Sequence, residues 1–247
     1  MRHRYGSHFH QFADCHIPPG DGPFPVAVLL HGGFWRERHT LELMDDLARD
    51  LVRRGWAAWN VEFRRVGEVS GGGYPRTLED VASAIDALAG LDAPLDLDAV
   101  VAIGHSAGGQ LALWAAARPD AAVRLAGVAA QAGVLDLRSA ERDPDGEAAV
   151  ALFMGGPAAE VPERYADASP IERVPIGVPQ LLVHGEADVR VPAATSRRYA
   201  EVARAAGDEV ELVLRPREDH FVHLDPAGGA WAQVVGWLER FRARVGA

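Results

Sequence analysis

A serine, an acid and a histidine that lie far apart in this chain could together carry out acyl transfer. Ser106 is the central residue of GHSAG at 104–108, which fits the pattern GxSxG. A serine hydroxyl is a poor nucleophile near neutral pH, so it needs a neighbouring base, and the base needs an acid that fixes its tautomer. The pentapeptide therefore makes Ser106 a candidate nucleophile for a reaction that passes through an acyl-enzyme.

Candidates for the base and the acid follow two later apolar runs. His220 lies in the segment EDHF at 218–221, and Asp188 lies in HGEADVRVP at 184–192. Glu186, Glu218 and Asp219 compete with Asp188 for the role of the acid. The two acids that adjoin His220 in sequence are poorly placed to reach behind its ring. Asp188 and Glu186 therefore remain as alternatives at this point.

The segment HGGFW at 31–35 could supply a second catalytic device. Acyl transfer generates an oxyanion, which preorganised backbone N–H groups stabilise, and glycines let the backbone approach the substrate. The alternative interpretation of this segment is a plain glycine turn after a strand.

The spacing of apolar residues predicts the elements that would position these groups. We expect strands at residues 9–17, 26–30, 57–63, 97–103, 125–130, 180–184 and 209–214, and helices at 40–53, 78–91, 107–117, 194–206 and 230–245. Strands that alternate with helices imply a mainly parallel sheet covered on both faces. Ligands bind beyond the carboxyl ends of the strands in such sheets, and every candidate above comes just after a strand. The context strand, GxSxG, helix is that of a nucleophile elbow.

The length of 247 residues suits a single α/β domain, which we expect over 1–247. Residues 133–179 interrupt the alternation with prolines, charges and only short helical pieces, and they are interpreted as a small cap inserted over the end of the sheet. Phe153 in that segment, together with Trp35 and Tyr74, is a weak candidate for the substrate pocket. For Trp35, ordinary packing under the glycine loop is favoured.

Charge and composition exclude several other classes of protein. The chain has 25 Lys+Arg against 35 Asp+Glu, a net charge of −10, and no basic cluster, which argues against nucleic acid and anionic membranes as partners. Cys15 is the only cysteine, so no internal disulfide can form. The N-terminus has no apolar core typical of a signal peptide, and no apolar run is long enough to span a membrane. A cytoplasmic protein is therefore expected, as a monomer or a homodimer.

Three motifs together resemble the α/β-hydrolase superfamily of serine hydrolases. They are GHSAGG at 104–109, HGEADVRVP at 184–192 and DHF at 219–221, and the likeness runs from about residue 26 to the C-terminus. The resemblance implies the α/β-hydrolase fold, with Ser106 as nucleophile, Asp188 rather than Glu186 as acid, and His220 as base. No metal or cofactor is required by this mechanism.

The glycine loop extends the resemblance. HGGFW is similar to the HGGxW variant of the oxyanion loop. The likeness implies that the N–H groups of Gly33, Phe34 and Ala107 form the oxyanion hole, that Gly32 shapes the turn, and that His31 braces the loop through a hydrogen bond.

The same motifs look most like the kynurenine formamidase (arylformamidase) branch and its small-esterase relatives. HGGxW also occurs in esterases of acetylated or aryl esters and in relatives of the prolyl oligopeptidase catalytic domain. We therefore expect hydrolysis of a carboxylic ester of a small molecule, with aryl-formamide hydrolysis as the alternative. A ligand-binding protein that has kept the fold without catalysis is the second alternative. A peptidase is less favoured, because it would usually need a further domain to restrict access.

Overall fold

The fold is built on one twisted sheet, seen in a computed structural model that describes residues 1–140 and 144–245. The eight strands lie in the order β1-β2-β4-β3-β5-β6-β7-β8. The first three in this order pair antiparallel, and all later neighbours pair parallel. The strands are β1 (Arg2–Arg4), β2 (Phe12–His16), β3 (Phe24–Leu30), β4 (Ala57–Glu62), β5 (Leu95–His105), β6 (Gly127–Gln131), β7 (Gln180–Gly185) and β8 (Val210–Arg215).

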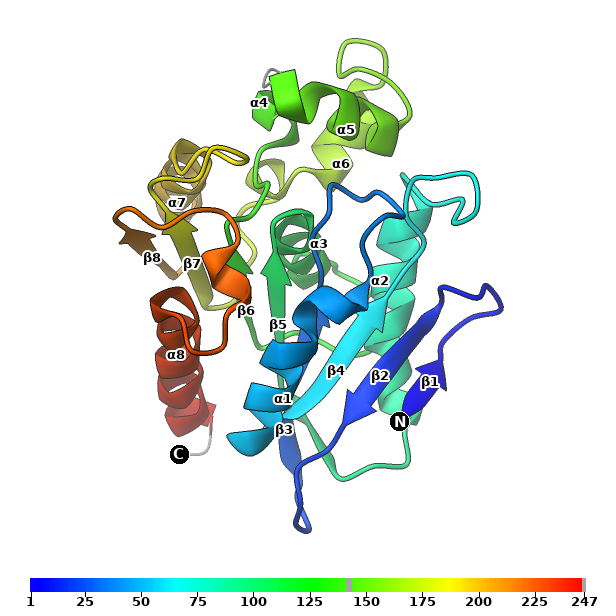
Figure 1. The fold of residues 1–247 in the computed structure, drawn as a ribbon, viewed down its shortest axis with the longest axis vertical. Coiled ribbons are helices and arrows are strands. Elements are labelled where there is room, and N and C mark those ends of the chain that lie inside the picture. Colours follow the sequence, from blue (N-terminus) through cyan, green and yellow to red (C-terminus); the bar gives the residue numbers. More distant parts are fainter. Residues whose placement is uncertain (141–143, 246–247) are drawn as a thin grey trace.

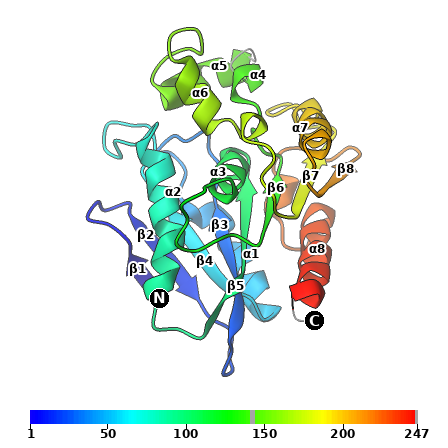
Figure 2. The same cartoon turned by 180° about the vertical axis from the view of Figure 1, so that it is seen from behind.

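Helices cover both faces of the sheet (Figures 1 and 2). One face carries α1 (Asp45–Arg53) and α8 (Gly229–Val245), and the other carries α2 (Arg76–Asp86), α3 (Ala107–Ala116) and α7 (Ala194–Ala205). Short 3-10 turns, η1 (Leu41–Met44), η2 (Ala87–Gly90) and η4 (Val222–Leu224), join these elements. The predicted α/β-hydrolase architecture is therefore confirmed.

The two layers of helices have separate cores that share the same strands. Val26, Val28 and Leu30 of β3 pack with α2 and α3, whereas Ala27 and Leu29 pack with α1 and α8. Successive side chains of a strand point to opposite faces, so a strand buried on both faces must be apolar at every position. This requirement explains the continuous apolar run by which β3 was predicted.

The segment 133–179 lies between β6 and β7 and rises over the carboxyl ends of the central strands (Figure 1). It contains α4 (Leu137–Ala140), α5 (Pro144–Met154), α6 (Pro162–Ala168) and η3 (Pro170–Glu172). Helix α5 has 11 residues, so the segment is more helical than the expected short pieces. We refer to residues 133–179 as the cap; its status as an insertion within one domain stays a prediction.

The N-terminal strand was predicted too long, and its neighbour was missed. The predicted strand at 9–17 is shortened to β2, and residues 2–4 form the additional edge strand β1. Arg2 pairs with Asp14 across this edge, with Nη2 and Oδ2 2.8 Å apart. An exposed edge strand carries little apolar periodicity, so a pattern of apolar residues could not have found it.

Candidate active site

Ser106 lies on a strained turn between β5 and α3. Its backbone has φ 56° and ψ −119°, a region that side chains other than glycine rarely occupy. The flanking glycines make the turn possible. A Cβ on Gly104 would clash with the carbonyl oxygen of Gly108, and one on Gly108 would clash with the carbonyl oxygen of Leu30. The local geometry is that of a nucleophile elbow, and it places Ser106 at the carboxyl end of β5.

Asp188 and His220 meet from the loops that follow β7 and β8. His220 Nδ1 lies 2.7 Å from Asp188 Oδ2, so the ring donates to the carboxylate and keeps Nε2 as its basic nitrogen. The other carboxylate oxygen accepts backbone N–H bonds from Arg190 and Val191 at 2.8 and 2.9 Å. Burial opposes the ionisation of Asp188, but hydrogen bonds from His184, His220 and Val191 outweigh it and hold the pKa of Asp188 well below its usual value.

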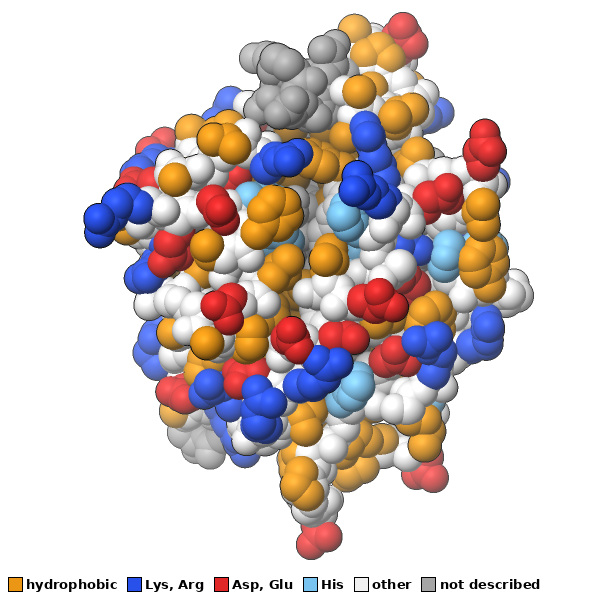
Figure 3. Space-filling view, in the orientation of Figure 1, with side chains coloured by type: hydrophobic (Ala, Val, Ile, Leu, Met, Phe, Trp, Pro, Cys, Tyr) orange, Lys and Arg blue, Asp and Glu red, His pale blue; other side chains and the backbone are white. Residues whose placement is uncertain are grey.

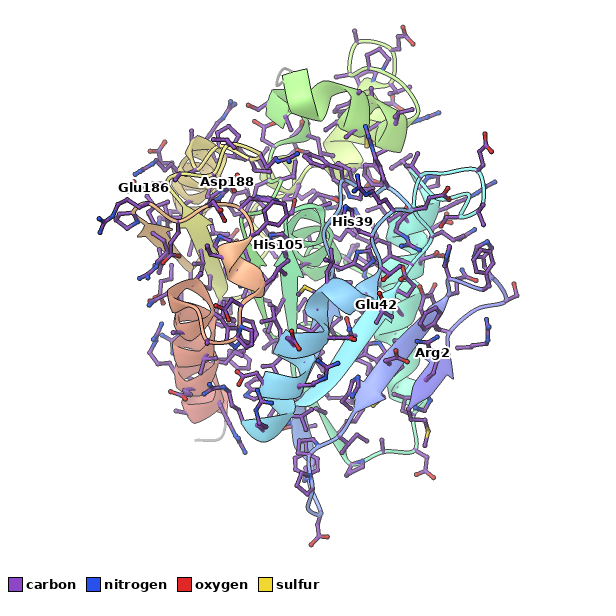
Figure 4. All side chains as sticks on the ribbon, viewed as in Figure 1. Arg2, His39, Glu42, His105, Glu186 and Asp188 are labelled. Carbon is purple, nitrogen blue, oxygen red and sulfur yellow. The ribbon has the colours of Figure 1, made fainter. Side chains whose placement is uncertain are left out.

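The competing acids have other partners. Glu186 pairs with Arg197 and lies farther out than Asp188, as Figure 4 shows. Glu218 pairs with Arg215, and Asp219 accepts a backbone N–H bond from Phe221. Of the four acids considered from the sequence, Asp188 is the one that contacts the ring of His220.

Ser106 and His220 line the same cavity, which has a volume of about 270 Å³. Gly33 and Phe34 line it too, so the structure brings the predicted nucleophile, base and glycine loop together. Among the described residues, no hydrogen bond joins the Ser106 hydroxyl to His220. Catalytic hydrogen bonds in ligand-free hydrolases are often long and tighten when substrate binds, so this geometry is compatible with a serine–histidine pair.

The backbone of the glycine loop has positive φ angles, and the N–H groups at these positions take no part in the hydrogen bonds of a helix or strand that the structure describes. Phe34 and Trp35 have φ angles of 52° and 55°, next to Gly33 at 113°. Among the described residues, the N–H groups of Gly33, Phe34 and Ala107 have no backbone acceptor. Unpaired N–H groups beside a candidate nucleophile are what an oxyanion hole requires.

A buried carboxylate beneath this loop was not predicted. Glu62, the last residue of β4, lies 3.3 Å from His31 Nε2 and accepts backbone N–H bonds from Leu41 and Phe63 at 3.1 and 3.0 Å. Arg65 pairs with it at 3.2 Å, and both side chains are almost fully buried. Burial opposes ionisation of Glu62, but His31 and Arg65 lower its pKa. An acid at the end of a mostly apolar strand was the signal in the sequence.

His31 contacts both this carboxylate and its own loop. Its Nδ1 lies 2.8 Å from the carbonyl oxygen of Gly32, in addition to the contact of Nε2 with Glu62. These contacts are compatible with the bracing role expected of His31, which stays a prediction, and Glu62 is a partner that sequence reasoning did not name.

The predicted pocket residues Trp35, Tyr74 and Phe153 line neither cavity of this site. Trp35 and Phe153 are buried and stack face to face, with ring centroids 4.4 Å apart. Tyr74 lies next to this pair, because its backbone N–H donates to the carbonyl oxygen of Phe153 at 2.7 Å. Stacking removes the rings of Trp35 and Phe153 from water, so these two residues join the glycine loop to the cap and line neither cavity.

A second, larger cavity of about 470 Å³ opens between the cap and α7. Phe34 and Arg190 line both cavities and thus form the boundary between them. Arg38, His39 and Arg190 were not predicted as site residues, although Arg38 and His39 follow HGGFW within four residues and Arg190 lies within HGEADVRVP. His39 and His105, labelled in Figure 4, both line the cavity that contains Ser106.

The fold and the arrangement of these residues define the class of protein to which the chain belongs. The sheet of eight strands is mostly parallel, and a serine lies on the turn between β5 and α3. An Asp–His pair comes from the loops after β7 and β8. This combination is that of an α/β hydrolase. The chain belongs to the prolyl oligopeptidase family, which it matches over residues 54–241.

Two curated relatives are similar over most of this chain. A "Putative carboxymethylenebutenolidase" of Methylorubrum extorquens is 26% identical over 238 residues, which cover 91% of this chain and 75% of that protein. Dipeptidyl-peptidase 5 of Porphyromonas gingivalis is 26% identical over 235 residues, or 88% of this chain. The chain spans only 34% of the length of that peptidase.

Solved structures show the same fold at low sequence identity. A truncated carbohydrate esterase from gut microbiota has a TM-score of 0.84 at 18% identity, covering 98% of this chain and 95% of that one. The esterase Est2 of Thermogutta terrifontis has a TM-score of 0.79 at 22% identity, covering 100% of this chain and 92% of that one. Within the described residues, no helix is both long enough and apolar enough to cross a membrane. The cytoplasmic location stays a prediction.

Proposed function

We propose that this protein is a serine hydrolase that cleaves a carboxylic ester of a small molecule through an acyl-enzyme. The observation that carries the proposal is the hydrogen bond between Asp188 and His220 at the edge of a cavity that also contains Ser106 and the glycine loop. The names of the relatives and fold neighbours, a carboxymethylenebutenolidase and several esterases, support an ester as the substrate.

The mechanism follows from the roles of these groups. His220 Nε2 takes the proton of the Ser106 hydroxyl while the oxygen attacks the ester carbonyl. The N–H groups of Gly33, Phe34 and Ala107 stabilise the oxyanion. The C–O bond to the alcohol breaks as His220 returns the proton to the leaving oxygen. Water then repeats the two steps on the acyl-enzyme and releases the acid and the free serine.

The dimensions of the site favour a short acyl group. The cavity at Ser106 holds about 270 Å³ and includes the apolar side chains of Leu43 and Leu224. The wider cavity under the cap could then receive the alcohol. Aryl-formamide hydrolysis, by the same machinery as in kynurenine formamidase, remains the alternative, because a formyl group would fit the same small space.

A covalent probe and a serine variant test the proposal. A fluorophosphonate should label the protein at Ser106, and Ser106→Ala should lose labelling and about 10⁶-fold in turnover of 4-nitrophenyl acetate while its circular dichroism is unchanged. Ser83→Ala, on the exposed face of α2, is the matched control and should keep both properties.

A comparison of substrates separates the alternatives. Faster turnover of N-formylkynurenine than of short esters would favour the formamidase, and turnover of dipeptidyl 4-nitroanilides would favour a peptidase. Failure of the folded protein to react with the probe or with any of these substrates would contradict the proposal and favour a binding protein.

A further inference from the structure

Among the residues whose side chains the structure describes, two arginines line the cavity of Ser106 and His220 without a carboxylate partner. Arg38 comes from the glycine loop, and Arg190 comes from the loop that carries Asp188. Both are exposed, and neither guanidinium forms an ion pair or hydrogen bond with the residues whose side chains the structure describes. By contrast, the buried Arg65 of the same region is paired with Glu62.

The cavity is positive although the chain as a whole is negative. The net charge is −10, yet no described residue that lines this cavity is Asp or Glu. Three histidines, His39, His105 and His220, also line this cavity. Burial and the neighbouring charge of Arg38 lower the pKa of His39 and favour its neutral form, so the positive charge comes from the two arginines. Figure 3 shows Arg side chains on either side of the hollow below the cap, and the chain has no Lys. A positive cleft in an acidic protein attracts anions.

The carboxylate that lines the adjoining cavity does not pair with Arg190. This carboxylate, Asp136, already accepts the backbone N–H of Ser139 at 3.0 Å and pairs with Arg198 at 3.4 Å. Arg190 stands at the boundary of the two cavities, so it can reach a group attached to either side of a bound ester.

We infer that the substrate carries a carboxylate, which Arg38 and Arg190 bind while Ser106 attacks a separate ester carbonyl. Guanidinium groups are suited to this task because they are always charged and bind carboxylates through two parallel hydrogen bonds. The inference rests on the proposed function and specifies its substrate class as anionic esters.

Matched pairs of esters test the inference on the intact protein. Mono-4-nitrophenyl succinate is compared with 4-nitrophenyl butyrate for a carboxylate on the acyl side, and 3-acetoxybenzoate with 3-acetoxybenzamide for one on the alcohol side. We expect kcat/KM for the anionic member of at least one pair to exceed that of the neutral member by about tenfold or more, because charge-assisted hydrogen bonds contribute about 1.5–3 kcal/mol. The preference should weaken as salt is added.

Three arginine variants locate the effect. Arg38→Gln and Arg190→Gln should each lower the ratio of anionic to neutral kcat/KM about tenfold, mainly through KM. Arg36→Gln is the matched control, because Arg36 is exposed on the same loop as Arg38 but lines neither cavity. An unchanged ratio in both test variants, or an equal fall in the control, would overturn the inference.

A binding measurement keeps this inference separate from the proposed function. Titration of Ser106→Ala with benzoate and with benzamide needs no turnover, and benzoate should bind more tightly and lose that advantage in Arg38→Gln and Arg190→Gln. Hydrolysis of neutral esters without any anion preference in either assay would leave the proposed function standing and refute the carboxylate site. Equal binding of the two probes would also refute it.

Discussion

At the scale of single residues, the site depends on a backbone conformation and a charge state that the surrounding protein must stabilise. Ser106 keeps a left-handed φ of 56°, and Asp188 stays ionised although it is buried. Four donors surround the Asp188 carboxylate: the rings of His184 and His220 and the backbone N–H groups of Arg190 and Val191. A buried carboxylate with this many donors orients a histidine well, because neither group can turn without losing a hydrogen bond.

Replacing that carboxylate tests its role. Asp188→Asn should lower kcat for ester hydrolysis by about 10⁴-fold, because the amide can stabilise the wrong tautomer of His220 and cannot compensate the charge of the imidazolium. Glu186→Gln is the matched control at an exposed acid of the same loop, and it should change kcat little. Steady-state kinetics of both variants decide, and equal losses would contradict the assignment of the acid.

At the scale of elements, β4 supports the glycine loop from below. Glu62 at the end of this strand contacts the loop through His31 and the start of η1 through the backbone of Leu41, while Arg65 fixes its charge. One buried carboxylate thus connects three segments that border the cavity. The loop carries two non-glycine residues at positive φ, and such strain persists only where neighbouring contacts hold it.

Breaking this cluster should affect stability first. Glu62→Gln is expected to lower the free energy of unfolding by about 3–5 kcal/mol, because it leaves the charge of Arg65 buried without a partner. The double variant Glu62→Gln/Arg65→Met removes that charge and should recover part of the loss. Urea unfolding followed by circular dichroism measures both. A single variant as stable as the parent, or a double variant less stable than the single one, would count against this account.

At the scale of the whole molecule, the site is assembled where the sheet, the cap and the last loop meet. His105 from β5 donates to the backbone carbonyl of His220 at 2.9 Å, and His223 lies nearby with its ring centroid 6.1 Å from that of His105. Burial is the main cause that lowers the pKa of His105 and of His223, each from 6.5 to about 3. The interior beside the candidate site therefore contains two histidines whose burial favours the neutral form in the folded protein.

Acid should destabilise the protein through these two rings. Between pH 6.5 and about 3 the unfolded chain binds protons that the folded chain does not, so the free energy of unfolding falls as the pH is lowered through this window. His223→Leu should make that fall shallower, whereas His16→Leu, half-buried on β2, serves as the control. Urea titrations across this pH range test the prediction, which fails if wild type and His223→Leu lose stability in parallel.

The sequence by itself determined the alternation of strands and helices, the parallel sheet, and the motifs that hold Ser106, Asp188 and His220. Such features are local, because a strand buried on both faces must be apolar and a tight turn must have glycine. Only the tertiary structure decided which of four acids faces His220, that Glu62 braces the glycine loop, and that Trp35 and Phe153 stack on each other instead of facing the cavity. It also decided that Arg38 and Arg190 share one cavity whose described lining contains no carboxylate. These are contacts between segments distant in sequence, and no local pattern of residues specifies them.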